Sequence, residues 1–415
     1  MRVRESAKGG CSDWTVHVAA LSLARHAGQF YRTWRLQPER VCFKCGLIAC
    51  RQTEMPAGGQ ALPALQSDVN VAGDHAGAFR ESEGNQAMLK VFALWALLPA
   101  LAVAGGSNYT VAPGVSRPAG KISEWNVPTP KFARDPAPGL DGRIYIAVMA
   151  GNRLARFDPA TERFEEWELP AGTRPHGLVV DERGTVWMTG NGNGTLLEIP
   201  FSNGQPQAMK PHPAPSGGSP HTIVFDGRDS LWFTNQSANK VTRYQRSSGK
   251  MEEFSTHDGP YGLALDRDGN VWFCQASGQR VGRIDARSSK ITEIDLGAGS
   301  LPRRIAAAPD NTLWVVRYGD GKLTHIDAAK QSVLKSYEMP AGPRGNPYAV
   351  TVDGAGKVWA NEISVDTVSL LDPATGKFQV FSLPTNNEGI RKMIVDAQGR
   401  LWYMGSHSGK LGMVQ

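Results

Sequence analysis

Apolar and polar residues alternate in short runs through residues 121–415, and Gly, Asp, Asn and Pro separate the runs. Alternation with a period of two is typical of β-strands that bury one face. The clearest runs contain the phrase Asp-x-x-Gly-x-Val-Trp, as in residues 181–187, 266–272 and 353–359. Asp and Gly favour a tight hairpin turn, so the phrase predicts two antiparallel strands joined at that turn.

The phrase belongs to a repeat of 40 to 45 residues, marked by one aromatic residue in each unit. The seven markers are Tyr145, Trp187, Trp232, Trp272, Trp314, Trp359 and Trp402. Each unit continues with a third strand, a second turn and a fourth strand. Four strands in such a period are typical of a β-propeller blade, whose faces are buried only when neighbouring blades stack on it. We therefore predict an all-β, seven-bladed β-propeller with the aromatic markers in the core between blades.

The two ends of the repeat region complement each other. Residues 410–415 read as the third strand of the last unit, whereas residues 121–128 read as a fourth strand with no first three before it. We expect residues 121–128 to complete the last blade, which would close the ring and leave no exposed sheet edge. An open β-sandwich is the alternative, but it would not require this complementary truncation.

Residues 88–104 have the features of a secretory signal peptide. Met88 and Lys90 precede the apolar residues 91–104, which end in the small-x-small sequence Ala102-Val-Ala104. The run is shorter than the roughly 20 residues that a membrane span needs. We expect cleavage after Ala104, a periplasmic or secreted protein without stable membrane insertion, and a linker at 105–120. The alternative is a buried strand or helix of a cytosolic protein.

A signal peptide acts at the start of a chain, so residues 1–87 are expected to be an unstructured upstream extension or the product of a start assigned too early. They show no sustained period of 2 or 3.6 residues. Cys42, Cys45 and Cys50 resemble half of a zinc site, but no second CxxC or HxxxH pair completes it. With Cys11 and Cys274 they are the only cysteines, which excludes a disulfide scaffold for the repeats.

The net charge of the chain gives little information about its partners. The chain carries 45 Lys and Arg against 39 Asp and Glu, a formal charge of +6 over 415 residues without a basic arm. This surplus excludes nucleic acid as an expected partner. We expect a monomer that acts on a small molecule.

One position recurs eleven residues before each aromatic marker and carries large polar side chains. This inner set comprises Arg134, His176, His221, Tyr261, Arg303, Tyr348 and Arg391. The strand that faces it is expected to present a facing set: Val148, Gly190, Asn235, Gln275, Arg317, Glu362 and Gly405. Inner strands line the channel of a propeller, so both sets are predicted to meet at one mouth of that channel.

Four Arg against one carboxylate at this mouth favour a ligand with acceptor oxygens, such as carbonyls, carboxylate or phosphate. We predict that Arg134, Tyr261, Arg303, Arg317, Tyr348 and Arg391, with Asn235 and Glu362, bind that ligand. His176 and His221 occur in the same Pro-His phrase in adjacent units and are candidate catalytic residues, because His is the natural general base near neutral pH. The alternative is that these polar groups hold water and cap the strands.

The Pro-His and Pro-Tyr phrases, Leu-Trp-Phe-Thr at 231–234 and Gln-Arg-Val-Gly-Arg-Ile at 279–284 resemble the virginiamycin B lyases, and the resemblance spans residues 121–415. The resemblance implies a seven-bladed propeller that opens streptogramin B antibiotics by eliminating across the C–O bond of the macrocyclic ester. It also implies a His general base, matched by His221, a second His on the substrate side, matched by His176, and Mg²⁺ held by Glu residues.

The chain departs from the family motif at both metal positions. Ser219 stands two residues before His221 where the family has Glu, and Asn235 or its neighbour Gln236 stands about fourteen residues after it where the family has a second Glu. The His pair also occupies the second and third units, whereas in the family it occupies the last two. Mg²⁺ is therefore expected from the resemblance, but the residues that would hold it have changed.

The sequence supports three hypotheses about function. The first is an exported lyase with His221 as base, His176 and Tyr261 positioning the substrate, and Arg303 and Arg317 replacing the charge of the metal. The second is a non-catalytic periplasmic propeller that binds a ligand or a protein. The third is a gluconolactonase-like metal hydrolase, which the count of seven units and the single carboxylate of the facing set disfavour.

Overall fold

The structure, a computed structural model, describes residues 3–7, 12–26, 29–42 and 121–415. These residues form two separate units. The smaller is a three-stranded antiparallel sheet in the order β1-β2-β3, with β1 at Val3–Ala7, β2 at Ser12–His26 and β3 at Gln29–Cys42. The sheet lies within residues 1–87, whose interpretation as an upstream extension or the product of a start assigned too early stays a prediction. The stretch around Trp14-Thr-Val-His-Val18 is rich in residues that favour strands.

The predicted signal peptide at 88–104, the linker at 105–120 and two of the three clustered cysteines, Cys45 and Cys50, lie outside the described residues. Those expectations stay predictions, as does the suggestion that translation starts at Met88. No helix in the described part of the chain is both long and apolar enough to cross a membrane.

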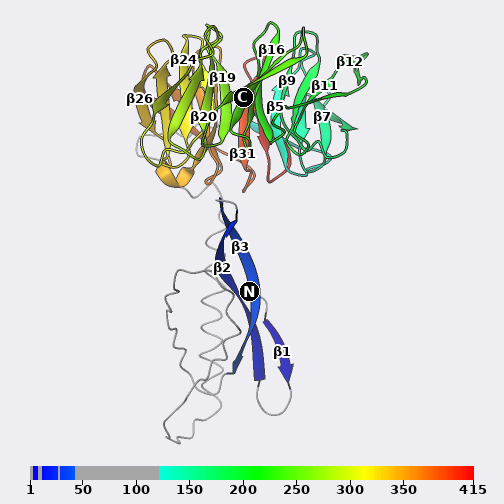
Figure 1. The fold of residues 1–415 in the computed structure, drawn as a ribbon, viewed down its shortest axis with the longest axis vertical. Coiled ribbons are helices and arrows are strands. Elements are labelled where there is room, and N and C mark those ends of the chain that lie inside the picture. Colours follow the sequence, from blue (N-terminus) through cyan, green and yellow to red (C-terminus); the bar gives the residue numbers. More distant parts are fainter. Residues whose placement is uncertain (1–2, 8–11, 27–28, 43–120) are drawn as a thin grey trace, which may run out of the picture. The chain divides into compact units, whose positions relative to one another are not determined.

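The larger unit is a seven-bladed β-propeller with four antiparallel strands in each blade, as predicted. Figure 1 shows its sheets, from cyan to red along the chain. Blades 1 to 3 contain β5 (Ala133–Pro138), β6 (Ile144–Val148), β7 (Arg153–Asp158), β8 (Arg163–Glu168); β9 (Pro175–Val180), β10 (Val186–Gly190), β11 (Thr195–Ile199), β14 (Lys210–Pro213); and β15 (Pro220–Phe225), β16 (Ser230–Asn235), β17 (Lys240–Gln245), β18 (Lys250–Ser255).

Blades 4 to 7 repeat the same order, and the last blade takes its outer strand from the start of the propeller. They contain β19 (Pro260–Leu265), β20 (Val271–Gln275), β21 (Arg280–Ile284), β22 (Ile291–Asp295); β23 (Pro302–Ala307), β24 (Thr312–Arg317), β25 (Lys322–Asp327), β26 (Ser332–Glu338); β27 (Pro347–Val352), β28 (Val358–Glu362), β29 (Thr367–Asp372), β30 (Lys377–Ser382); and β31 (Ile390–Val395), β32 (Leu401–Gly405), β33 (Lys410–Val414), β4 (Ile122–Asn126).

Strand β4 closes the ring by pairing with β33 from Lys410 opposite Asn126 to Val414 opposite Ile122. The Glu124 side chain reinforces this closure, since it accepts hydrogen bonds from Tyr403 Oη (2.7 Å) and from Lys410 Nζ (3.3 Å). The innermost strands contact one another around the whole ring, and β31 returns to contact β5. The predicted complementary ends are therefore confirmed.

Seven apolar clusters fill the seven interfaces between adjacent blades, and the aromatic markers lie in them. The interface of blades 4 and 5, for example, buries Trp272, Leu313 and Ile326 completely. In blades 2, 4, 6 and 7 the Asp that opens the hairpin phrase accepts the indole N–H of the marker Trp, at 2.9 Å for Asp266 and Trp272. The same carboxylate that shapes the turn therefore also fixes the core side chain.

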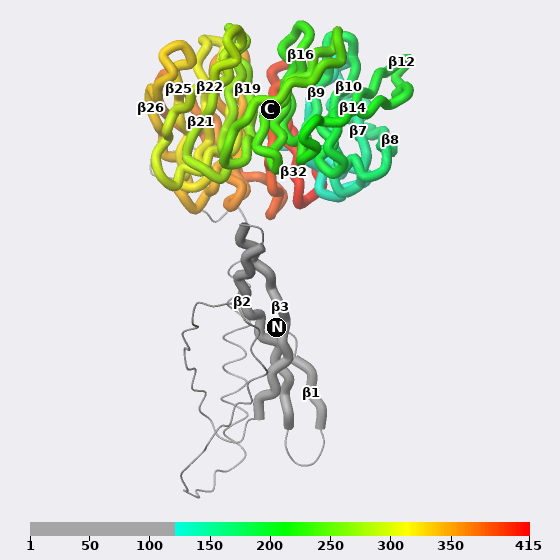
Figure 2. Tube along the Cα trace, viewed as in Figure 1, coloured from blue at the N-terminus to red at the C-terminus, as the bar shows by residue number. Residues whose placement is uncertain are grey.

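Two short elements interrupt the regular blades. A hairpin of β12 (Phe201–Ser202) and β13 (Gln205–Pro206) is inserted before the outer strand of blade 2, and Figure 2 shows it at the edge of the ring. A 3₁₀ turn, η2 (Gly342–Gly345), precedes the inner strand of blade 6.

Candidate functional site

Each of the seven inner strands contains a β-bulge at its start, and the inner set occupies it. In blade 3, Pro220 pairs with Asn235 and Ile223 with Phe233, so His221 and Thr222 together oppose the single residue Thr234. The same shift occurs in the other six blades. We call the first bulge residues, which are the inner set, the bulge ring, and their successors the second ring: Asp135, Gly177, Thr222, Gly262, Arg304, Ala349 and Lys392.

The bulge ring forms one connected group of side chains, as predicted. The rings of His176 and His221 lie 3.5 Å apart between centroids, and those of His221 and Tyr261 lie 3.9 Å apart. Tyr261 and Tyr348 share a hydrogen bond between their hydroxyl groups. Arg134 Nη2 bonds His176 Nε2 and lies 3.5 Å from Tyr261 Oη. All five side chains are buried.

The two remaining members of the bulge ring are half-buried arginines that lie over nearby aromatic side chains. Arg303 lies over Tyr318, with 4.8 Å from Cζ to the ring centroid, and donates from Nη1 to the carbonyl of Ala276. Arg391 lies 5.0 Å over Tyr348 and lies 3.1 Å from His407 Nε2 through Nη2. These two guanidinium groups are the most accessible cations of the ring.

The contact with Arg134 determines the protonation of His176. A guanidinium group only donates hydrogen bonds, so His176 Nε2 must be the acceptor, and the proton of the neutral ring lies on Nδ1. Nδ1 is buried and has no partner among the described residues. Because its Nε2 lone pair is occupied, His176 presents a donor rather than a base.

His221 has a different environment. Its Nδ1 lies 3.0 Å from Thr222 Oγ1, and that oxygen accepts a hydrogen bond from Arg304 Nη1 at 2.6 Å. When Nδ1–H donates to Thr222, the Nε2 lone pair of neutral His221 is free to take a proton. Thr222 therefore occupies the place of the group that orients a catalytic base.

Burial is the main cause of the perturbed titration in the ring. It lowers the pKa of His176 and His221 well below the usual value, and Arg134 and Arg304 lower both further. It raises the pKa of Tyr261 to about 12. For Tyr348 burial acts in the same direction, but Arg134 and Arg391 outweigh it and lower the pKa. Both imidazoles are therefore neutral near pH 7.

Arg304 of the second ring crosses the channel beneath the histidines. Its Nη2 donates to both carboxylate oxygens of Asp135 in blade 1 at 3.1 and 3.3 Å, and its Nε donates to the carbonyl of Arg391 in blade 7 at 3.1 Å. With Thr222 in blade 3, this one side chain joins three other blades to its own. Lys392, also in the second ring, has its pKa lowered to about 8 by burial.

The facing set does not pair with the bulge ring, which corrects the predicted register between the two strands. Because of the bulge, its members pair with the residue before each ring member. Asn235 Nδ2 donates to the carbonyl of Gly217 (2.7 Å), Glu362 accepts the backbone N–H of Ala341 (2.8 Å), and Arg317 is ion-paired with Asp320. These three side chains anchor nearby loops, and their predicted roles in ligand binding stay predictions.

Four residues of the second ring were not predicted, although each directly follows a predicted ring residue: Arg304, Asp135, Thr222 and Lys392. Strict alternation places consecutive residues on opposite faces of a strand. Only a β-bulge lets the second residue share the site with the first, and no residue pattern in the Pro-His and Pro-Tyr phrases indicates a bulge. The neighbouring inner strand explains why the second-ring residue of blade 2 is glycine. A Cβ on Gly177 would lie 2.4 Å from the carbonyl oxygen of His221, so only Gly fits there.

The residues at this site do not fit the Mg²⁺ implied by the resemblance. Ser219 and Asn235 replace the two carboxylates, and the Asp135 carboxylate is already bound by Arg304. Mg²⁺ prefers carboxylates and water, whereas this site is crowded with guanidinium groups. Within the described residues no three His, Cys, Asp or Glu side chains come together in a way that could hold a metal ion.

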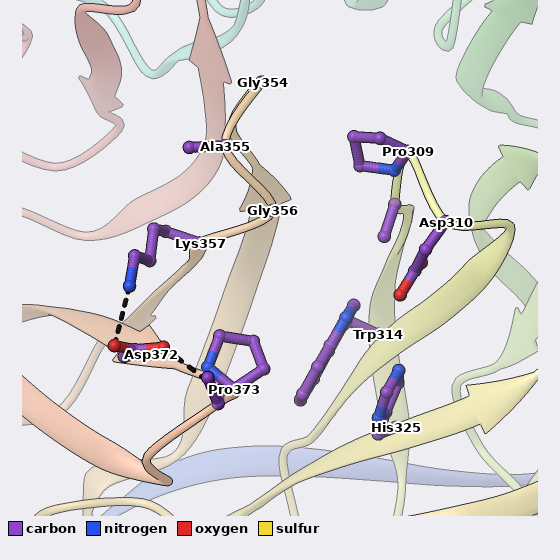
Figure 3. A pocket seen from close by; sticks show the side chains of 12 residues that line it. Pro309, Asp310, Trp314, His325, Gly354, Ala355, Gly356, Lys357, Asp372 and Pro373 are labelled. Carbon is purple, nitrogen blue, oxygen red and sulfur yellow. Dashed lines mark hydrogen bonds and ion pairs between the residues drawn. The ribbon is translucent and has the colours of Figure 1, made fainter.

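A separate pocket of about 420 Å³ lies between blades 5 and 6 and contains none of the ring residues. Figure 3 shows the stacked Trp314 and His325 on one wall and the ion pair of Lys357 and Asp372 on the other. The pocket is lined by the hairpin turns at the far ends of the inner strands. It therefore lies at the opposite end of those strands from the bulge ring.

Comparisons with known proteins agree with this fold. No curated protein matches the chain. Solved structures that share the fold include a streptogramin B lyase, at 21% identity with a TM-score of 0.65 over 71% of this chain and 97% of that one. Selenomethionine-substituted virginiamycin B lyase from Staphylococcus aureus, and a catalytically inactive variant of it with quinupristin, give the same identity and score over 71% of this chain and 99% of theirs. The profile of the Virginiamycin B lyase family matches residues 201–415, and the chain belongs to that family.

Proposed function

We propose that this protein is an exported carbon–oxygen lyase that opens a cyclic ester by elimination, with its substrate bound at the bulge ring. The observation that carries the proposal is the close pair of imidazoles, with ring centroids 3.5 Å apart, of which His221 has Thr222 as an orienting partner. The family membership supports the reaction class, and the streptogramin B lyases that share the fold support the substrate class.

The reaction assigns a distinct task to each group. His221 Nε2 takes a proton from the carbon next to the one that carries the ester oxygen, a C=C bond forms, the C–O bond breaks, and the ester carboxylate leaves. His176 Nδ1–H donates to a substrate oxygen, and Tyr261 packs beside the reacting atoms. Arg303 and Arg391 stabilise the negative charge that develops on the departing carboxylate, which is the electrostatic contribution expected of a dry site. No step requires Mg²⁺.

A mass-spectrometric assay distinguishes this reaction from hydrolysis. Elimination opens the ring without changing the mass, whereas hydrolysis adds one water. The full chain is incubated with a streptogramin B antibiotic in EDTA and in Mg²⁺, and the products are separated by chromatography. We expect an isomeric product that shows a new alkene absorbance in both buffers.

Histidine variants locate the chemistry. His221→Ala should lower turnover about 10²-fold or more, the usual contribution of a general base. His325→Ala is the matched control, because His325 lines the pocket at the opposite end of the strands. An added water in the product, turnover that depends on Mg²⁺, or full activity in His221→Ala would contradict the proposal.

The second candidate function is a non-catalytic periplasmic propeller that binds a ligand or a protein. The engagement of His176 by Arg134 favours it, because that contact removes one of the two bases. This alternative predicts thermal stabilisation by a ligand that is recovered unchanged.

Export and assembly complete the proposal. The signal sequence at 88–104 predicts that the mature protein recovered from the periplasm or medium begins at Gly105, which Edman degradation or intact mass would show. The completed ring leaves only the short outer-strand edges of its four-stranded blades, so we expect a monomer by light scattering. We expect no nucleic-acid partner.

A further inference from the structure

The two rings hold far more positive than negative charge. Arg304 is the one cation there that is paired with a carboxylate, that of Asp135, at 3.1 Å. The others form no ion pair with any carboxylate in the described part of the chain: Arg134, Arg303, Arg391 and Lys392. Arg134 is 5% exposed, and the other three are partly buried. Cations held away from water without a counter-charge are costly, so a bound partner of opposite charge would stabilise them.

Unused hydrogen-bond donors gather at the same place. The Nε atoms of Arg134, Arg303 and Arg391 are buried and have no partner among the described residues, and neither does His176 Nδ1. All four atoms carry a proton, because arginine stays charged and the His176 proton lies on Nδ1. They are four of the sixteen buried side-chain N and O atoms that have no partner among the described residues, and a buried donor without an acceptor is costly.

We propose that the bulge ring binds its ligand through an anionic group, a carboxylate or a phosphate. A carboxylate or phosphate has only acceptor oxygens, so it matches a site that offers only donors, and Arg binds both through paired N–H bonds. This inference rests on the proposed function for the position of the ligand and adds the charge that the ligand carries. It also explains why the family's acidic metal ligands are missing here, because a cationic ring would repel Mg²⁺.

Arg303 and Arg391 are the cations that the anion reaches from solvent. Both are half-buried, and they stack on Tyr318 and Tyr348, whose rings lie 6.0 Å apart in an edge-to-face arrangement. The aromatic rings hold the two guanidinium groups in place while leaving their Nε–H groups without partners. The anion therefore lies above the tyrosine pair.

Thermal unfolding and titration calorimetry of the full chain test this inference with inorganic phosphate in one arm and citrate in the other. Sodium chloride at matched ionic strength is the reference. We expect saturable stabilisation by at least one of the two anions, about 5 °C at a hundredfold excess over Kd. Arg303→Gln and Arg391→Gln should each weaken binding about tenfold, because a hydrogen bond to a charged group is worth roughly that much. Arg183→Gln, with a side chain 79% exposed, is the control and should bind as the unmodified protein does.

Which anion saturates distinguishes a phosphate ligand from a carboxylate ligand. Equal stabilisation by chloride, or unchanged binding in both ring variants, overturns the inference. If a glutamine variant does not fold, Arg391→Lys replaces it, which keeps the charge but loses the paired N–H groups and should still weaken binding. Saturable, arginine-dependent binding without turnover would remove the lyase proposal alone, whereas turnover without saturable anion binding would remove this inference alone.

Discussion

Replacing Arg304 by Met should destabilise the propeller far more than the loss of any surface arginine. Arg304 is 3% exposed and bonds both oxygens of Asp135, which is 2% exposed. Removing one member of a buried ion pair leaves the other charge without compensation and costs about 3–5 kcal/mol. At about 2–4 °C for each kcal/mol in a domain of this kind, the melting temperature should fall by roughly 6–20 °C.

Urea unfolding followed by tryptophan fluorescence measures the loss, and a double-mutant cycle with Asp135→Asn assigns it to the pair. The double variant should lose less than the sum of the single variants, with a coupling of about 1–3 kcal/mol. Arg153→Met is the control, because Arg153 pairs with Glu168, whose side chain is 80% exposed, and should cost at most about 1 kcal/mol. A loss for Arg304→Met as small as that of the control, or strictly additive losses in the cycle, would refute the reasoning.

Two further predictions concern stability. Burial raises the pKa of Glu388 to about 8 from 4.5, so the folded state keeps a proton that the unfolded chain releases, and stability should fall as the pH rises from about 4.5 to about 8. Melting temperatures measured across this pH range should fall less steeply in Glu388→Gln than in the unmodified protein. An unchanged dependence of the melting temperature on pH in that variant would exclude Glu388 as its source. Asp266→Ala removes the acceptor of the Trp272 indole N–H and of the turn N–H groups and should cost about 1–3 kcal/mol by urea unfolding, whereas the exposed Asp268→Ala should be nearly neutral.

The architecture was predictable from the sequence because it depends on local, repeated signals. Each Asp-x-x-Gly phrase sets a hairpin, the aromatic markers set the period, and the fourth strand at β4 had no other blade to join. The position of the bulge ring followed from the same register. Its seven side chains lie together because every blade places this position at the start of its inner strand.

The partners of the site residues were not predictable, because they depend on the bulges and on contacts across the channel. A regular ladder would put Asn235 opposite His221, but the bulge shifts it to Pro220 and directs its amide to a loop. Arg304 spans four blades, and nothing near residue 304 in the sequence indicates Asp135, which lies 169 residues earlier. Likewise the tautomer of His176 depends on Arg134 in the preceding blade.

The central claim is that the bulge ring is one ligand site with neutral histidines, and NMR of histidine-labelled protein tests it most directly. Resonances of His176 and His221, assigned with single Gln variants, are followed during titration with a streptogramin B antibiotic and with phosphate. We expect neutral imidazole shifts for both at pH 7 and saturable changes in both, with His325 unaffected. Charged imidazoles before titration, or changes confined to His325, would contradict it.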